Sequence, residues 1–236
     1  MRHRTPFRNL IERLLPGPSG GLIHGSGSPV CLPARQGLLY LPPHPKGTLH
    51  IGLIDCSSSM AATDYPPDRC EAGKQAFQCF IQTRAQHFPN DFVGIVAFNH
   101  QASVVHPPVQ LGDPHSLHRL AQSLSLIFPN GQTNLDVGLM QSYHLACEYQ
   151  YLGVEYLRVL VLTDGHSSGD PVAAAQYLKE AGGVIEIVGI ARTPADVNEP
   201  VLKQCASWQN GRLLYRFIGD GDSEALISHF GGLALE

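Results

Sequence analysis

The feature that most constrains the fold is a pair of short apolar runs in which apolar and polar residues do not alternate. Residues 51–54 and 159–162 contain only Ile, Leu, Val and Gly. Successive side chains of a β-strand point to opposite faces, so a strand that is apolar on both faces must be covered on both faces. Such strands are typical of parallel sheets, whose crossover helices pack on each side. The two runs therefore predict an α/β domain.

Apolar runs and helical patterns alternate along the rest of the chain. We expect strands at 49–55, 92–98, 101–106, 157–163, 184–191 and 212–218, and helices at 69–87, 115–126, 134–152, 171–182, 197–208 and 222–230. The strands at 92–98 and 101–106 are separated by two residues, which cannot carry a crossover, so they should form an antiparallel hairpin. The prediction is a doubly wound, mostly parallel sheet of about six strands with one antiparallel edge strand and helices on both faces.

Residues 1–45 differ in composition from the rest of the chain and are predicted to be an N-terminal extension with a Pro/Gly/Ser-rich linker. A basic amphipathic segment at the start could dock on a partner or an acidic surface, or form a loosely ordered arm. A short strand is expected at 38–41. The globular domain is then expected at 46–236.

Composition narrows the class of protein. The net charge of −4 argues against a nucleic-acid-binding surface. The six cysteines form no C-x-x-C pair, which is typical of a reducing compartment. The first 16 residues lack the apolar core of a secretory signal, and no 18-residue uncharged apolar run occurs. We therefore expect a cytoplasmic protein without a membrane span.

Oxygen-bearing side chains follow the first strand in an Asp-x-Ser-x-Ser pattern, formed by Asp55, Ser57 and Ser59. Asp164 ends a later strand in the same way, and Thr133 lies in a Gly-Gln-Thr turn before a helix. Carboxyl ends of neighbouring parallel strands meet at one crevice. We expect these five side chains to converge on a divalent cation, because carboxylate and hydroxyl oxygens suit Mg²⁺.

These three pieces resemble the metal-ion-dependent adhesion site (MIDAS) of von Willebrand factor type A (VWA) domains, over about residues 46–235. The segments 59–72 and 92–98 are similar to bacterial members, including those linked to MoxR-type AAA+ ATPases. The resemblance implies a Rossmann-like VWA fold, direct metal ligation by Ser57, Ser59 and Thr133, and water-mediated roles for Asp55 and Asp164. It also implies that a partner's carboxylate completes the site. Ser58 stands where Gly is usual.

An enzymatic interpretation is an alternative to the adhesion site. Residues 165–169 satisfy Gly-x-Ser-x-Gly, with Ser167 as the nucleophile of an α/β serine hydrolase and with Asp196 or Asp222 and then His229 following in the order of such a triad. Against this reading, Asp170 and Pro171 delay the helix that should begin at the nucleophile.

Two further alternatives have weaker motifs. An aspartyl phosphatase of the haloacid dehalogenase type usually carries a second Asp where Ser57 stands. A zinc site could use His115 and His118, with His100 and His106 nearby.

The sequence hypothesis is a non-enzymatic, cytoplasmic VWA-like domain that binds Mg²⁺, with Mn²⁺ or Ca²⁺ as other cations. It would use the cation to grip an Asp or Glu carboxylate of a protein partner. It would act as a component or adaptor of a larger complex that could contain an AAA+ ATPase.

Overall fold

The computed structural model describes residues 47–165 and 167–236. A six-stranded sheet in the order β3-β2-β1-β4-β5-β8 forms its centre, and only the β2–β3 pairing in it is antiparallel. Its strands are β1 (Thr48–Asp55), β2 (Phe92–Phe98), β3 (Ala102–Gln110), β4 (Tyr156–Thr163), β5 (Val184–Ile190) and β8 (Tyr215–Ile218). The predicted mostly parallel sheet with one antiparallel edge strand is confirmed.

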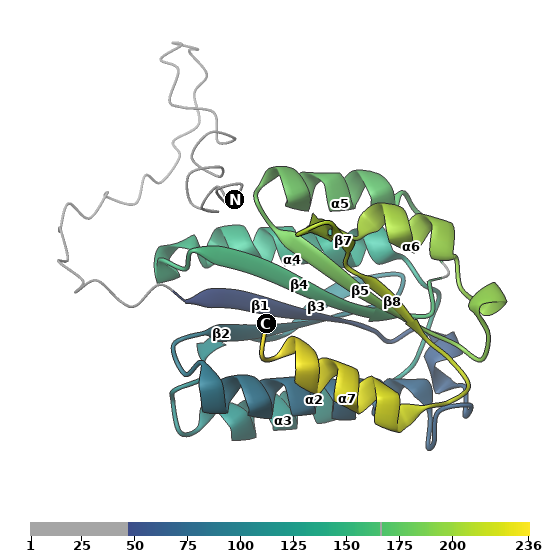
Figure 1. Ribbon diagram of the computed structural model, residues 1–236, viewed down its shortest axis with the longest axis horizontal. Helices are drawn as coiled ribbons and strands as arrows, with labels where there is room; N and C mark the ends of the chain where they lie inside the picture. The colour runs from purple at the N-terminus through teal and green to yellow at the C-terminus, as the bar shows by residue number, and fades with distance from the viewer. Residues whose placement is uncertain (1–46, 166) are drawn as a thin grey trace, which may run out of the picture.

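Helices cover both faces of the sheet, as predicted. One layer contains α2 (Arg69–His87), α3 (Ser116–Ser125) and α7 (Ser223–Leu233); the other contains α4 (Leu135–Glu148), α5 (Pro171–Glu180) and α6 (Glu199–Cys205) (Figure 1). Short elements join them: η1 (Ser58–Ala61), η2 (Gln150–Leu152), η3 (Pro194–Asp196) and a small hairpin of β6 (Trp208–Gln209) and β7 (Arg212–Leu213). The fold is therefore a three-layer α/β sandwich.

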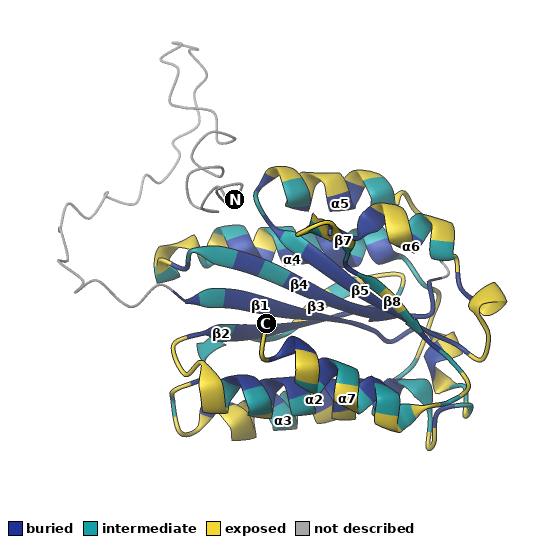
Figure 2. Ribbon diagram, in the orientation of Figure 1, coloured by how far each residue is buried: buried dark blue, intermediate teal, exposed yellow. Residues whose placement is uncertain are grey.

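The central strand β1 is buried along almost its whole length, which explains its lack of alternation (Figure 2). Leu53 belongs to the core beneath α4 and α5, whereas Ile54 belongs to the core beneath α2 and α7. On the α2 side, the Phe77 ring lies directly over Gly52, where an added Cβ would come within 2.1 Å of the ring. A glycine at this position lets α2 approach the sheet closely.

The sequence prediction was wrong around residues 197–218. The helix expected at 197–208 ends at Cys205, and the strand expected at 212–218 is divided between β7 and β8. Asn210 and Gly211 have positive φ angles of 53° and 78° and form the tight turn of the β6–β7 hairpin. The buried Leu214 then accepts a hydrogen bond from Ile187 N, which is where the chain leaves the hairpin and joins the main sheet.

Strand β3 is longer than the predicted 101–106 and continues through Pro107 and Pro108 to Gln110. Proline lacks a backbone N–H, but β3 is an edge strand with a neighbour on one side only. The pairing with β2 is irregular between Val93 and Val96, so the prolines fall where the ladder is already interrupted.

The N-terminal extension predicted at 1–45, its basic amphipathic segment and the short strand at 38–41 lie outside the described residues. Within the described ranges, every helix is too short or too polar to cross a bilayer.

Candidate metal centre

The two predicted carboxylates lie at the carboxyl ends of neighbouring strands. Strand β1 ends at Asp55, Asp164 directly follows β4, and the two strands pair in parallel up to Ile54 and Leu162. Both carboxylates are fully buried, with 0% of either residue exposed. The topology thus brings two acidic groups together at one edge of the sheet.

Asp55 is held by neutral donors. One carboxylate oxygen accepts a hydrogen bond from Ser57 N at 2.8 Å, and the other accepts one from Thr163 Oγ1 at 2.6 Å. Burial, together with the nearby Asp164 carboxylate, raises the pKa of Asp55 to about 7, although the hydrogen bonds from Thr163 and Ser57 partly oppose this rise. Two buried carboxylates that repel each other make a place where a cation would be stabilised.

The serine hydroxyls of the motif lie beside this pair. Ser57 Oγ and Ser59 Oγ are 3.1 Å apart, with Ser57 buried and Ser59 exposed. Ser58 is not among the residues with positive φ, so the turn does not need the glycine that the family usually has there. Its N–H donates to the Gly131 carbonyl at 2.9 Å. The two hydroxyls face each other, as two ligands of one ion would.

The loop that carries Thr133 is fastened to the same turn. Asn130 N donates to the Cys56 carbonyl at 2.7 Å, which adds to the Ser58–Gly131 bond. On its other side, the Thr133 carbonyl accepts a hydrogen bond from Ser168 N at 3.2 Å. Half-buried Thr133 is therefore positioned between the loop after β1 and the loop after β4, and its hydroxyl makes no hydrogen bond with any residue the structure describes.

The two carboxylate oxygens of Asp164 differ in their hydrogen bonding. Arg69 Nη1 lies 3.4 Å from Oδ2, and the same guanidinium forms two hydrogen bonds with Asp64 at 2.6 and 2.7 Å. Oδ1 of Asp164 is buried without a hydrogen-bond partner in the described structure. A buried carboxylate oxygen without a partner is costly. This oxygen suits a cation or a cation-bound water, so the donor set fits the divalent metal that the resemblance implies.

Arg69 and Thr163 belong to this site although sequence reasoning did not include them. Thr163 precedes Asp164, and its hydroxyl both donates to Asp55 and accepts from Gly165 N at 3.0 Å. Arg69 opens α2 and reaches two acidic residues from different loops. The short spacing between Asp64 and Arg69 was the available signal for that pair.

Metal sites of the zinc type receive no support from the geometry. Among the residues that the structure describes, no three or more His, Cys, Asp or Glu side chains form a possible metal cluster. His115 and His118 therefore lack a third ligand of this kind there. The candidate centre differs from such a cluster because three of its five side chains carry hydroxyls.

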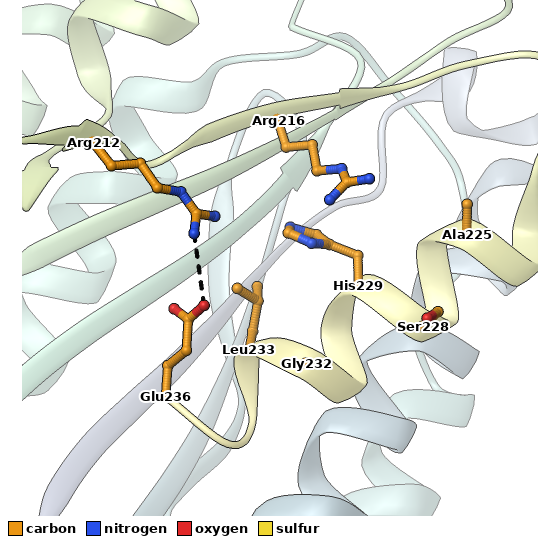
Figure 3. A pocket seen from close by; sticks show the side chains of 8 residues that line it. All are labelled: Arg212, Arg216, Ala225, Ser228, His229, Gly232, Leu233 and Glu236. Carbon is orange, nitrogen blue, oxygen red and sulfur yellow. Dashed lines mark ion pairs between the residues drawn. The ribbon is translucent and has the colours of Figure 1, made fainter.

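The hydroxyl of Ser167, the nucleophile of the alternative hydrolase hypothesis, contacts the start of α4. Its Oγ accepts a hydrogen bond from Leu135 N at 3.0 Å, at the start of α4. The helix α5 begins only at Pro171, and Asp170 caps it by accepting from Ala173 N. His166 lies outside the described residues. No hydrogen bond between described residues joins Ser167 to His229, which faces a separate pocket beside β8 (Figure 3).

Comparison with known proteins agrees with this architecture. The model of the von Willebrand factor type A domain family matches residues 51–166, which include all five predicted ligands. The search of curated proteins gives no match.

Solved structures with the same fold come from several kinds of protein. BatB from Bacteroides thetaiotaomicron is 20% identical, with a TM-score of 0.61, over 80% of this chain and 100% of that one. The VWA domain of SpRpn10 is 15% identical, with a TM-score of 0.64, over 77% and 94% of the two chains. The pilus adhesin SpaC from Lactobacillus rhamnosus GG is 14% identical, with a TM-score of 0.66, over 80% of this chain and 30% of that one. At these identities the likeness concerns the fold.

Proposed function

This chain contains a von Willebrand factor type A domain, and from that premise we propose that it binds a partner protein through a divalent cation. The proposed ligand set is that of a MIDAS: Asp55, Ser57, Ser59, Thr133 and Asp164. The observation that carries the proposal is the buried, unpartnered Oδ1 of Asp164 at a crevice shared with Asp55. The hydroxyl pair of Ser57 and Ser59 supports it.

The chain's own groups would prepare the site in two ways. Thr163 and the Ser57 N–H fix the Asp55 carboxylate, so its oxygens are already oriented. Arg69 holds one oxygen of Asp164 and leaves the other available. When bound, the cation would act as a Lewis acid for an incoming oxygen. Neutral hydroxyl ligands withdraw little of its charge, which favours a negatively charged partner group.

A carboxylate of the partner is the group this arrangement fits best. Mg²⁺ prefers oxygen ligands, and the site commits only two carboxylates of its own. The loops around it are expected to set partner choice, including residues 61–68, 99–100, 130–134 and 167–170. Leu126 and Phe128 add exposed apolar surface close to this rim, with 70% and 65% of each residue exposed.

The wider setting of the proposal is an adaptor in an intracellular complex that contains an AAA+ ATPase. The five cysteines that the structure describes are all free thiols, which agrees with a reducing compartment such as the cytoplasm. Cell fractionation tests the location. Co-purification of the tagged chain with AAA+ ATPases, with and without EDTA, tests the partner class.

The matched variants Ser57→Ala and Ser58→Ala test the site. Both serines lie in the same turn, but only the Ser57 hydroxyl belongs to the proposed ligand set. Mg²⁺ should raise the melting temperature of the wild type and of Ser58→Ala, and EDTA should remove their metal-dependent partners in a pull-down. Ser57→Ala should lose both effects. Equal responses of the two variants would contradict the proposal.

A further inference from the structure

A second site is suggested by a cavity of about 400 Å³ between the β7–β8 segment and α7. It lies toward the opposite end of the sheet from the candidate metal centre. Glu236 at its rim reaches Arg158 near the amino end of β4, whereas Asp164 follows the carboxyl end of that strand. The volume falls in the range of small-molecule sites, which is roughly 300 to 1,000 Å³.

The cavity gathers positive charge on a chain whose net charge is −4. Arg212 and Arg216 line it from the strand side, and His229 and Ser228 line it from α7. Figure 3 shows the Arg216 guanidinium directed toward the imidazole ring of His229. Clustered cations with one carboxylate among them make a local field that favours anions.

The donors of these side chains are largely unused. Arg216 forms no ion pair or hydrogen bond with any described residue. The ion pair of Arg212 with Glu236 is long and exposed: Nη1 and Oε1 are 3.8 Å apart, and 59% and 49% of the two side chains are exposed. His229 Nε2 is shielded from solvent and has no partner among the described groups.

Neighbouring groups keep His229 neutral in the absence of a ligand. Burial, together with the positive charges of Arg216, Arg212 and Arg158, lowers the pKa of His229 to about 4. A nearby anion would relieve this repulsion. The neutral ring can still donate one hydrogen bond from Nε2 when that nitrogen carries the proton.

Arg158 does not take part, because its donors are already occupied. They bond Glu186, the Leu233 carbonyl and Glu236. Glu186 compensates the charge of Arg158, and Glu236 lies between Arg158 and Arg212. Arg216 is the arginine of the lining whose charge no described carboxylate compensates through an ion pair. A phosphate monoester carries about −1.5 to −2 charges, which matches two guanidinium groups better than a single carboxylate does.

We propose that this cavity binds the phosphate group of a small phosphorylated molecule, held by Arg212, Arg216 and His229. The planar guanidinium groups would donate to the phosphate oxygens from the strand side. The imidazole would donate from the helix side, with the Ser228 hydroxyl within the same lining. Space beyond the phosphate would hold the rest of the molecule.

The test is an NMR titration of the full chain in EDTA, which follows the imidazole resonances of His229. The probes are inorganic phosphate and glycerol 3-phosphate, with sodium chloride and sodium acetate at equal ionic strength as controls. We expect a saturable His229 shift with both phosphates and a much smaller one with chloride and acetate. Tighter binding of glycerol 3-phosphate than of inorganic phosphate would identify the ester as the better ligand, whereas the reverse order would assign free phosphate.

Matched arginine variants complete the test. Arg216→Gln should weaken phosphate binding at least about tenfold, because charge-assisted hydrogen bonds are lost. Arg192→Gln removes an exposed arginine outside the cavity lining and should leave binding unchanged. Arg212→Gln is the second variant if Arg216→Gln unfolds. A His229 shift that acetate or chloride reproduces, or equal binding by the Arg216 and Arg192 variants, would overturn the proposal.

Discussion

The stability of this domain should fall steeply between pH 6.5 and pH 4.5 because of one buried histidine, His50. Its Nε2 lies 3.1 Å from Asp91 Oδ2, and its Nδ1 is buried without a partner in the described structure. Asp91 also accepts from Arg84 Nε at 2.6 Å and from Thr48 N at 2.9 Å. The carboxylate can only accept, so the neutral imidazole donates from Nε2.

Burial lowers the pKa of His50 from 6.5 to about 4, Arg84 contributes in the same direction, and the hydrogen bond to Asp91 opposes the fall. Since the folded pKa is below the unfolded one, the stabilisation is complete above pH 6.5 and is lost as the pH falls toward 4. The difference of 6.5 − 4 = 2.5 pKa units corresponds to about 3 kcal/mol in total. At pH 4.5 about 2.5 kcal/mol of it should be lost. A typical domain has only about 5–15 kcal/mol of stability.

Urea unfolding in EDTA at several pH values measures this effect, with His50→Gln as the reference. The Gln amide can donate to Asp91 but does not titrate. The free energy of unfolding of the wild type minus that of His50→Gln should therefore decrease by about 2.5 kcal/mol from pH 7 to 4.5. Other titrating groups, including His229, are present in both proteins and cancel. A wild-type minus His50→Gln difference that does not change with pH would refute the reasoning.

Three further predictions concern the close contact of α2 with the sheet, the Thr163 hydroxyl and the cap of α7. Gly52→Ala should lower the free energy of unfolding by about 3 kcal/mol, because the new methyl group meets the Phe77 ring. Gly94→Ala is the matched control: its methyl group would have its nearest neighbour 3.3 Å away and should change this free energy by less than about 1 kcal/mol. Equal urea midpoints for the two variants would count against this packing. Thr163→Val should lower the free energy of unfolding by about 1–3 kcal/mol, since Asp55 Oδ2 and Gly165 N both lose their hydrogen bond with the Thr163 hydroxyl. An unchanged urea midpoint would contradict that role. Asp222→Ala should lower the free energy of unfolding by about 1 kcal/mol, because α7 loses the N-terminal cap in which Asp222 accepts a hydrogen bond from Ala225 N. If the effect comes from capping and not from packing, Asp222→Asn should keep the wild-type stability and Asp222→Leu should not.

Much of the fold could be predicted because its signals are local. The helix 69–87 and the strand 92–98 agree with the structure at both ends, since each has a clear periodicity and a clear boundary. Asp68 at the start of that helix accepts a hydrogen bond from Glu71 N, as a capping residue should. Elements with strong local patterns and caps are predictable in this way.

The region around Asn210 failed because two signals competed. The helical pattern of residues 197–208 extends past the true end of the helix at Cys205, whereas the Asn-Gly dipeptide at 210–211 indicates the turn of a hairpin. Leu214 could not be predicted to divide the following strand, because its partner Ile187 lies on another strand. Pairings of this kind depend on the three-dimensional arrangement.

The candidate site divides in the same manner. Asp55 and Asp164 follow apolar strands, so their common edge can be derived from the sequence. Arg69 and Thr163 act through partners that are distant in the chain, 95 and 108 residues away. The spacing of Asp64 and Arg69 marks that pair locally, but the contacts of Arg69 with Asp164 and of Thr163 with Asp55 depend on how the fold brings the loops together.

Isothermal titration calorimetry, in which Mg²⁺ is added to the EDTA-treated, dialysed protein, tests the proposed cation site most directly. We predict one saturable site in the wild type and in Ser58→Ala, and loss of at least about tenfold in affinity in Ser57→Ala and Asp164→Asn. The unpartnered Oδ1 of Asp164 makes the second variant informative, because the amide has one oxygen fewer to offer. Absence of binding to the wild type, or equal affinity in all four proteins, would contradict a cation site at Asp55, Ser57, Ser59, Thr133 and Asp164.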